Sequence, residues 1–251
     1  MAKKENSNKT SVVAQNLHPW RLCAPGRHWV REHALTRPPS QKNPGGSTTI
    51  RHAHCADNPS KKDQLYPDEI QEMAQQNFSK VEKKPCPIGL EFKEKGSQYD
   101  DLIAGWTKYW NDILKPDIPL DPNVVKALIA TESGFNPKIL ANKKDKNSAR
   151  GLMQVTNESR KILGNEKGEL KNHYLTLKRE NLNDPCNNIC AGIRWLFRKR
   201  EIASSLLKRA ASWDEAIYEF KGGRTTSKER AQKLMNEFNK ALKELSKCGK
   251  S

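Results

Sequence analysis

The fold of this chain is decided by one stretch, Ala130-Thr131-Glu132-Ser133-Gly134-Phe135-Asn136-Pro137. It closes a helix that the sequence predicts to begin at Asp121-Pro122, because Asp caps free backbone amides and Pro suits the first helical turn. Gly134 and Pro137 then end the helix, since Gly accepts the backbone of a helix end and Pro cannot continue it. The stretch therefore predicts a helix with a defined start and stop.

Glu132 lies on the apolar stripe of this predicted helix. Val124, Leu128 and Phe135 are spaced 0, 4 and 11 along the chain, and Glu132 falls at spacing 8. Apolar surroundings disfavour an ionised carboxylate, so a glutamate placed there can hold a proton and act as a general acid. Periodicity alone fits equally well a glutamate at the edge of the stripe near a fraying helix end.

Further helical patterns surround this stretch, and together they predict a mainly α carboxy-terminal part. They cover 97–114, 156–163, 184–197, a capping-box sequence from Ser212, and the residues after Ser227. The region before residue 96 differs, because it is rich in His, Pro, Asn and Gly and shows no sustained helical period before Pro67. We expect two parts: a small, irregular, partly β region over 1–95 and a helical domain over 96–251.

Two segments in the amino-terminal region resemble each other, 28–33 and 49–54, and each predicts a short strand followed by a turn containing proline. A helix is expected from Asp68 to Val81. Cys23, His28, His33, His52, His54 and Cys55 offer nitrogen and sulfur ligands, but their spacing follows no known zinc pattern. A Cys23–Cys55 disulfide, or no special chemistry, is favoured over a metal, and no metal site or cofactor is predicted.

The charge of the chain predicts an anionic partner. Lys and Arg number 45 against 29 Asp and Glu, a formal net charge of +16. Nucleic acid, acidic lipid and bacterial cell wall all qualify, whereas simple solvation of helix faces accounts for many of the lysines. No segment has the roughly 20 apolar residues of a membrane helix, and the basic start, Met1 to Lys9, precedes no apolar signal region.

Three sequence blocks, in this order, resemble the catalytic domain of the soluble lytic transglycosylases, which is related in fold to goose-type lysozyme. The blocks are Glu132-Ser133-Gly134-Phe135-Asn136-Pro137, Gly151-Leu152-Met153-Gln154-Val155, and Asp184-Pro185-Cys186-Asn187-Asn188-Ile189 followed by Gly192. The resemblance covers about 150 residues of the carboxy-terminal part. It implies a lysozyme-like helical fold with a groove for several sugars of peptidoglycan.

The same resemblance implies the chemistry. Glu132 would protonate the oxygen that leaves when the bond between N-acetylmuramic acid and N-acetylglucosamine breaks. As a base it would then help the muramic 6-hydroxyl to form a 1,6-anhydro end. Gln154 is expected to bind sugar and Met153 to lie below the groove or in the core. Asn188 is expected to bond the active-site backbone, and Ser133 to orient Glu132 or simply to end the helix.

The chain departs from the family pattern at two places. A longer loop carries Asp145, where goose-type lysozymes place an acid that positions the hydrolytic water, so hydrolysis remains an alternative to anhydro formation. A solvated loop charge is the equal alternative for Asp145. The family's Tyr-Asn pair corresponds to Phe220-Lys221, which keeps the ring and loses the hydroxyl. If that hydroxyl bonds the catalytic carboxylate in the family, Glu132 is expected here to be held less firmly or to be protonated more easily. Lys221 is expected at the surface, with substrate contact as the second option.

Six cysteines form an even number, which fits disulfides in an oxidising compartment. Cys186 and Cys190 are four residues apart, so pairing either with a distant cysteine such as Cys248 is easier than pairing the two, and free buried thiols are the alternative.

Other readings of function follow from organisation. Action at the cell wall, without a recognisable signal peptide, predicts an antibacterial effector or phage lysin, with a secretion apparatus and a cognate immunity protein as further partners. A peptidoglycan-binding protein that does not cut is the competing class. A nucleic-acid partner is not expected, because no recognition module is present.

Overall fold

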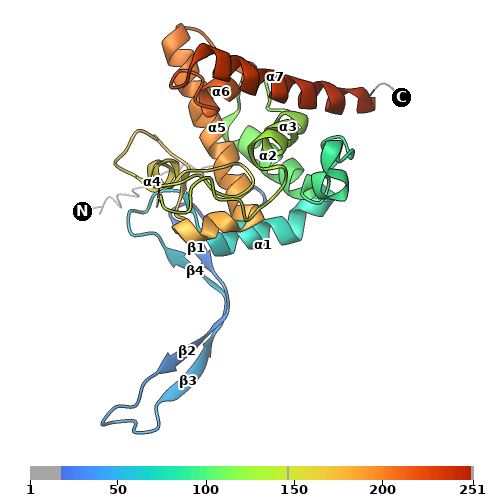
Figure 1. Cartoon of the computed structure of the whole chain (residues 1–251). Coiled ribbons are helices and arrows are strands. Elements are labelled where there is room, and N and C mark those ends of the chain that lie inside the picture. Colours follow the sequence, from blue (N-terminus) through green and yellow to red (C-terminus); the bar gives the residue numbers. More distant parts are fainter. Residues whose placement is uncertain (1–17, 146, 250–251) are drawn as a thin grey trace, which may run out of the picture.

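The computed structural model describes residues 18–145 and 147–249, and helices are the main secondary structure among them (Figure 1). The α-helices are α1 Pro67–Asn77, α2 Asp100–Leu114, α3 Pro122–Ser133, α4 Asn157–Gly164, α5 Pro185–Leu207, α6 Trp213–Phe220 and α7 Lys228–Leu245. The strands are β1 Arg27–Val30, β2 His33–Arg37, β3 Ser47–Arg51, β4 His54–Asp57, β5 Gln64–Leu65 and β6 Tyr174–Leu175. The predicted class, mainly α with a partly β amino-terminal region, is confirmed.

The predicted helix starts are confirmed by their side-chain caps. Asp121 accepts a hydrogen bond from the backbone N–H of Asn123 at 2.8 Å, and Asp184 accepts one from Asn187 at 2.8 Å. Ser212 forms the expected capping box at the start of α6, and Ser227 caps α7. These caps satisfy amides that a helix start leaves without a partner.

Helix α3 lies in the middle of the helical body, packed against α2 and α7 (Figure 1). Most of its residues are buried, from Val124 to Ala130. Even Lys126 is fully buried, where its ammonium donates to the Cys86 carbonyl at 2.6 Å and to Asp100 at 2.9 Å. A buried ammonium needs such partners. This packing fixes the position of the residues at the carboxyl end of α3.

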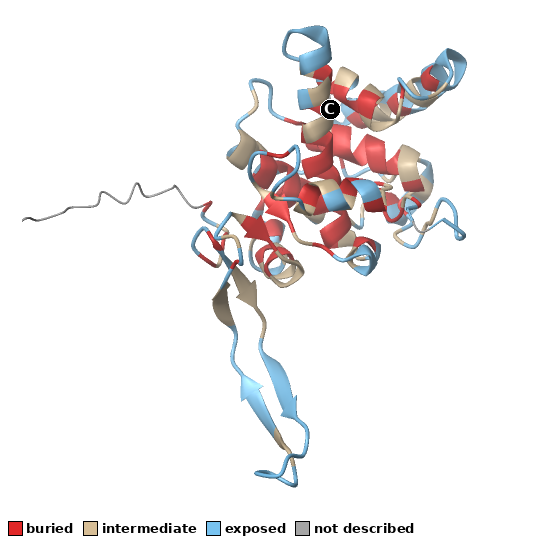
Figure 2. Cartoon of the chain, turned by 90° about the vertical axis from the view of Figure 1, so that its left-hand side faces the viewer, coloured by how far each residue is buried: buried red, intermediate tan, exposed pale blue. Residues whose placement is uncertain are grey.

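Strands β1 to β4 form one long hairpin that projects from the helical body (Figure 1). β1 pairs with β4 next to the body, and β2 pairs with β3 further out. The two segments predicted as separate strands therefore lie opposite each other, with His33 facing Arg51 in the register. All of β2 and most of β3 are exposed (Figure 2). We call residues 27–57 the arm.

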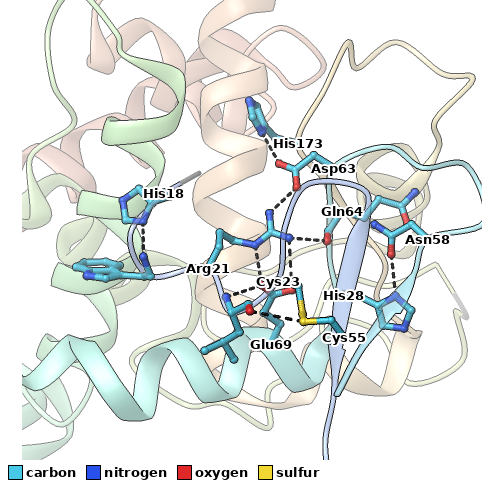
Figure 3. A network of polar contacts seen from close by, with 12 residues as sticks. His18, Arg21, Cys23, His28, Cys55, Asn58, Asp63, Gln64, Glu69 and His173 are labelled. Carbon is cyan, nitrogen blue, oxygen red and sulfur yellow. Dashed lines mark hydrogen bonds and ion pairs between the residues drawn. A yellow bond between two sulfur atoms is a disulfide. The ribbon is translucent and has the colours of Figure 1, made fainter. Parts of the chain in front are cut away.

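A buried ion cluster holds the base of the arm against the helical body (Figure 3). The guanidinium of Arg21 donates to Glu69 of α1 at 2.7 Å and to Asp63 at 2.5 Å. Asp63 in turn contacts His173, so the cluster joins segments that are 110 residues apart. The side chains of Arg21 and Glu69 are 2% and 0% exposed.

Two disulfides cross-link the described residues. Cys23–Cys55 joins the segment before β1 to β4, and Cys86–Cys248 joins the segment after α1 to the turn that follows α7. Cys186 and Cys190 are free and buried. The prediction that either of them pairs with a distant cysteine such as Cys248 was therefore wrong. Both cysteines lie in the core beside Trp106 and Trp110 of α2.

Three further observations concern expectations from the sequence. No helix of the described residues is long and apolar enough to span a membrane. The basic start, Met1 to Lys9, lies outside the described residues. The division at residues 95 and 96 stays a prediction; α1, which precedes it, contributes Ile70 and Met73 to the same core as α2 and α5.

Candidate functional site

Glu132 is the penultimate residue of α3, at the point where the helix emerges from the core. The helix ends at Gly134, whose φ of 55° is left-handed, and Phe135 follows with φ 60°. A side chain at Gly134 would press on the ring of Phe92 at 2.8 Å. Val124, Leu128 and Phe135 are buried, as the stripe predicts, whereas the side chain of Glu132 is 19% exposed. The carboxylate is thus held by a rigid helix and reaches solvent.

The direct partner of Glu132 is Lys221. The Lys221 ammonium donates to Oε1 of Glu132 at 2.6 Å. The Lys221 side chain is only 2% exposed, so the prediction of a surface lysine was wrong. The pair joins the end of α3 to the residue that follows α6. A buried positive charge at this distance stabilises the negative charge of the carboxylate.

A tight turn after α6 holds Lys221 in place. Its backbone N–H donates to the Ile217 carbonyl at 2.9 Å, which continues the helical pattern by one residue. Gly222 follows with φ 71°, and Gly223 donates to the carbonyl of Tyr218 at 2.9 Å. The Tyr218 hydroxyl donates back to the Gly223 carbonyl at 2.8 Å. These bonds direct the lysine toward α3.

The block from Gly151 to Val155 forms a tight backbone loop. Gly151 and Gln154 both have positive φ, 73° and 46°. Asn188 of α5 is fully buried and holds this loop: it accepts from the Met153 N–H at 2.8 Å and donates to the carbonyls of Arg150 and Leu182.

Gly192, one turn further along α5, lies against Met153. A β-carbon at Gly192 would collide with the Met153 side chain, which is fully buried in the core. Gly192 is therefore needed for the close contact between α5 and the loop.

A cleft of about 470 Å³ lies beside this loop and the turn after α6. Gln154 and Phe220 line it, together with Thr156, Glu158, Ser159, Ile162, Trp195, Lys199, Glu219, Gly222, Arg224 and Thr225. Phe220 and Gly222, the two sequence neighbours of Lys221, are on this wall, whereas Lys221 and Glu132 are not among the lining residues. Aromatic and polar walls of this kind suit a sugar chain.

The other predicted site residues lie as follows. Gln154 donates through Nε2 to the Gly151 carbonyl at 2.8 Å, which leaves its amide oxygen for a ligand. The Ser133 hydroxyl donates to the Ile129 carbonyl of its own helix at 3.1 Å, and no described contact joins it to the Glu132 carboxylate. Asp145 is exposed, and its carboxylate accepts from the backbone N–H of Asn147 at 2.8 Å.

Comparison with known families decides the classification. The profile of the "Transglycosylase SLT domain" matches residues 116–242, about half of the chain. The chain belongs to this family. The match begins before α3 and ends within α7, so the SLT domain contains Glu132, the loop at Gly151, Asn188 and Lys221. The resemblance inferred from the three sequence blocks is confirmed.

Solved structures and curated sequences add less. The 70 kDa soluble lytic transglycosylase of Escherichia coli is 17% identical, with a TM-score of 0.30, over 70% of this chain and 26% of that one. The chain thus spans about a quarter of that protein's length. No curated protein sequence matches significantly. Within the described residues, no group of three or more His, Cys, Asp or Glu side chains is placed to hold a metal ion.

Lys221 is the site residue that the sequence analysis missed. The signal was its place in the Phe220-Lys221 pair, where the family has Tyr-Asn. A replacement next to a family motif draws attention to the residue, but it does not reveal that the lysine points inward. That direction follows from the turn at Gly222 and Gly223 and from the end of α3, 89 residues away.

Proposed function

We propose that this SLT domain cleaves the glycosidic bond between N-acetylmuramic acid and N-acetylglucosamine in peptidoglycan, with Glu132 as general acid and then base. The observation that carries the proposal is the placement of Glu132: a partly exposed carboxylate on a rigid helix end, paired with Lys221, whose two sequence neighbours line a cleft with aromatic and amide walls. General acid–base catalysis needs such a positioned group.

The proposed reaction has two steps. Protonated Glu132 gives its proton to the bridging oxygen, and the bond from that oxygen to the muramic anomeric carbon breaks. The carboxylate then takes the proton of the muramic 6-hydroxyl while that oxygen bonds to the anomeric carbon. The product is a 1,6-anhydro end, and no second carboxylate is required, unlike in the common paired-carboxylate glycosidases.

The remaining predicted site residues have supporting roles in this proposal. Gln154 and Phe220 are on the cleft wall, and we propose that they contact sugar through the amide oxygen and the ring. Asn188 and Met153 hold the loop below the cleft through the bond between them. Ser133 supports the helix end that presents Glu132.

Digestion of purified peptidoglycan by the wild type and by Glu132→Gln tests the proposal. We expect muropeptides with anhydro ends from the wild type, by mass spectrometry, and a loss of rate of about 10²–10⁴-fold in the variant. Equal cleavage by both proteins, or no cleavage of glycosidic bonds by the wild type, would refute it. The second outcome would favour the non-catalytic binding protein.

Hydrolysis by a muramidase is the alternative within the same class. It would give reducing muramic ends, 18 Da heavier than anhydro ends because one water is added. Asp145→Asn separates the two possibilities, since only the hydrolytic route assigns this loop carboxylate a role. Its exposed position and its bond to the Asn147 N–H fit a solvated loop residue equally well.

We also propose that the arm binds the cell wall. Its outer half exposes Arg37, Lys42 and Arg51, and no described acidic side chain forms an ion pair with them. Isolated basic groups on an exposed hairpin suit an anionic polymer such as the wall. The cluster around Arg21 and the Cys23–Cys55 disulfide fix the base of the arm.

The test is co-sedimentation with insoluble peptidoglycan. Changing Arg37, Lys42 and Arg51 to Gln should lower the bound fraction several-fold. The matched control changes three exposed lysines of α7 to Gln: Lys228, Lys233 and Lys243. Equal losses in both triple variants would mean that net charge, rather than the arm, determines binding.

Action outside the reducing cytoplasm, at the cell wall, completes the proposal. Two disulfides support it, because such bonds persist in oxidising compartments. We propose that a secretion apparatus delivers the protein, and the separate arm that precedes the SLT domain supports this proposal. We also propose a cognate immunity protein as a partner. Expression in a bacterial periplasm should lyse cells, and equal survival of cells with wild type and with Glu132→Gln would contradict an antibacterial role.

A further inference from the structure

The Lys221 side chain is more deeply buried than the carboxylate that it contacts, 2% against 19% exposed. A lysine on the surface loses little by pointing into water, whereas a buried ammonium requires a compensating negative charge. Glu132 is the acidic side chain that supplies this charge within the described residues. The two residues therefore form one unit, and any protonation of Glu132 leaves the buried ammonium without its counter-charge.

We infer that Lys221 is a positioning residue that holds the Glu132 carboxyl group in one place through their ion pair. The inference rests on the proposed role of Glu132 as general acid. It adds a residue that touches the acid rather than the bond to be cleaved.

The geometry favours a fixed lysine. The turn that carries it is closed by two hydrogen bonds between Tyr218 and Gly223. An ion pair between Arg224 and Glu219 spans the same turn. A lysine on a free loop loses much of its effect to motion and solvent, but here the backbone on both sides of Lys221 is held. The ammonium thus stays at Oε1.

Other charged groups around the pair come from four helices and from the segment before α2. In the cleft these are Glu158 of α4, Lys199 of α5, and Glu219 with Arg224 around α6. A second hollow, beside Ala130 and Thr131 of α3, is lined by Glu91 before α2 and by Glu237, Lys240 and Glu244 of α7. The first set is balanced in sign and the second is net negative. Among the described residues, Lys221 is the cation within ion-pair distance of Glu132.

The two steps of the reaction need opposite forms of Glu132. Bond cleavage needs the acid, and removal of the 6-hydroxyl proton needs the carboxylate. Both steps therefore require the carboxyl group to stay in the same place, beside the bond to be cleaved. A fixed ammonium at Oε1 limits its movement between the two steps.

The experiment compares kcat and KM of the wild type and Lys221→Met on soluble glycan strands. Removal of the ammonium should lower kcat by about 10–100-fold with little change in KM, because a misplaced catalytic group slows the reaction without removing substrate contacts. Lys221→Arg keeps the cation and should keep most of kcat. Lys233→Met, which removes an exposed charge on α7, is the matched control and should leave kcat unchanged.

An unchanged kcat in Lys221→Met, with folding confirmed by circular dichroism, overturns the inference and leaves Lys221 a packing residue. Equal losses of kcat in Lys221→Met and Lys221→Arg would also overturn it, because only the second variant keeps the cation. Lys221→Asn, which carries the family's amide, takes the place of Lys221→Met if that variant does not fold. Full activity of Glu132→Gln would instead refute the proposed function, which separates the two failures.

Discussion

Arg21→Met should be among the most destabilising single substitutions in the chain. The Arg21 guanidinium and the Glu69 carboxylate are 2.7 Å apart, with side chains 2% and 0% exposed. At an effective dielectric constant of about 20, the attraction between unit charges at this distance is about 6 kcal/mol before desolvation is subtracted. Removal of one partner from a buried pair typically costs about 3–5 kcal/mol, because the other charge stays buried. We expect a loss in that range.

Urea unfolding followed by circular dichroism measures the loss. The control is Arg27→Met, because the Arg27–Asp57 pair is 48% and 80% exposed and should contribute less than about 1 kcal/mol. The double variant Arg21→Met/Glu69→Gln should recover part of the stability, since it removes the stranded charge. A loss below about 1 kcal/mol for Arg21→Met would refute the view that this cluster anchors the arm.

The cluster also has a pH signature. Burial alone would raise the pKa of Asp63, but the hydrogen bonds from His173 and Arg21 outweigh it and lower the pKa to about 2. A carboxyl whose pKa is lower in the folded state stabilises the fold above its unfolded pKa, 3.8 here. That stability is lost as pH falls through the folded value.

Three further predictions follow from the same kind of reasoning. Asp63→Asn should remove about 2 kcal/mol of stability at pH 6 and much less near pH 2, as measured by urea unfolding at both values; a loss that does not depend on pH would contradict the ionic role. Replacing Cys23 and Cys55 by Ser should lower the free energy of unfolding by about 3–4 kcal/mol, from the chain entropy that a disulfide across 32 residues removes. A reductant should lower the stability of the wild type through this disulfide, but it has no such effect on the variant, which lacks the disulfide. Asn188→Ala leaves three buried backbone groups without a hydrogen-bond partner and should lower the free energy of unfolding, measured by heating, by about 2–4 kcal/mol. An unchanged stability would mean that water replaces the amide.

Helix starts could be predicted from the sequence because their causes are local. Asp121, Asp184, Ser212 and Ser227 each accept a hydrogen bond from an amide two or three residues further on. Such bonds depend on a few neighbouring residues, so the residue types alone indicate them. The end of α3 at Gly134 is of the same kind, and it places Glu132 on the last turn of a buried helix.

Long-range pairings could not be predicted in this way. Cys86 forms a disulfide with Cys248 at a separation of 162 residues, and the two similar strand segments lie on opposite sides of one hairpin. Many pairings satisfy the same residue types, and only the packing of whole helices selects one of them. The direction of Lys221 belongs to this group, because it depends on where α6 lies against the rest of the domain.

The Phe220-Lys221 pair shows how a site can change while its catalytic residue stays. From the lost tyrosine hydroxyl, the sequence predicted a Glu132 that is held less firmly or protonated more easily. The structure supplies a charged donor at 2.6 Å instead, so the carboxylate has a firm partner. Lys221 thus reverses the expectation of a loosely held Glu132. An acid that is used first as a proton donor and then as a base has to stay in one place for both steps. Measured against the family's neutral amide in Lys221→Asn, kcat is therefore where this difference should appear.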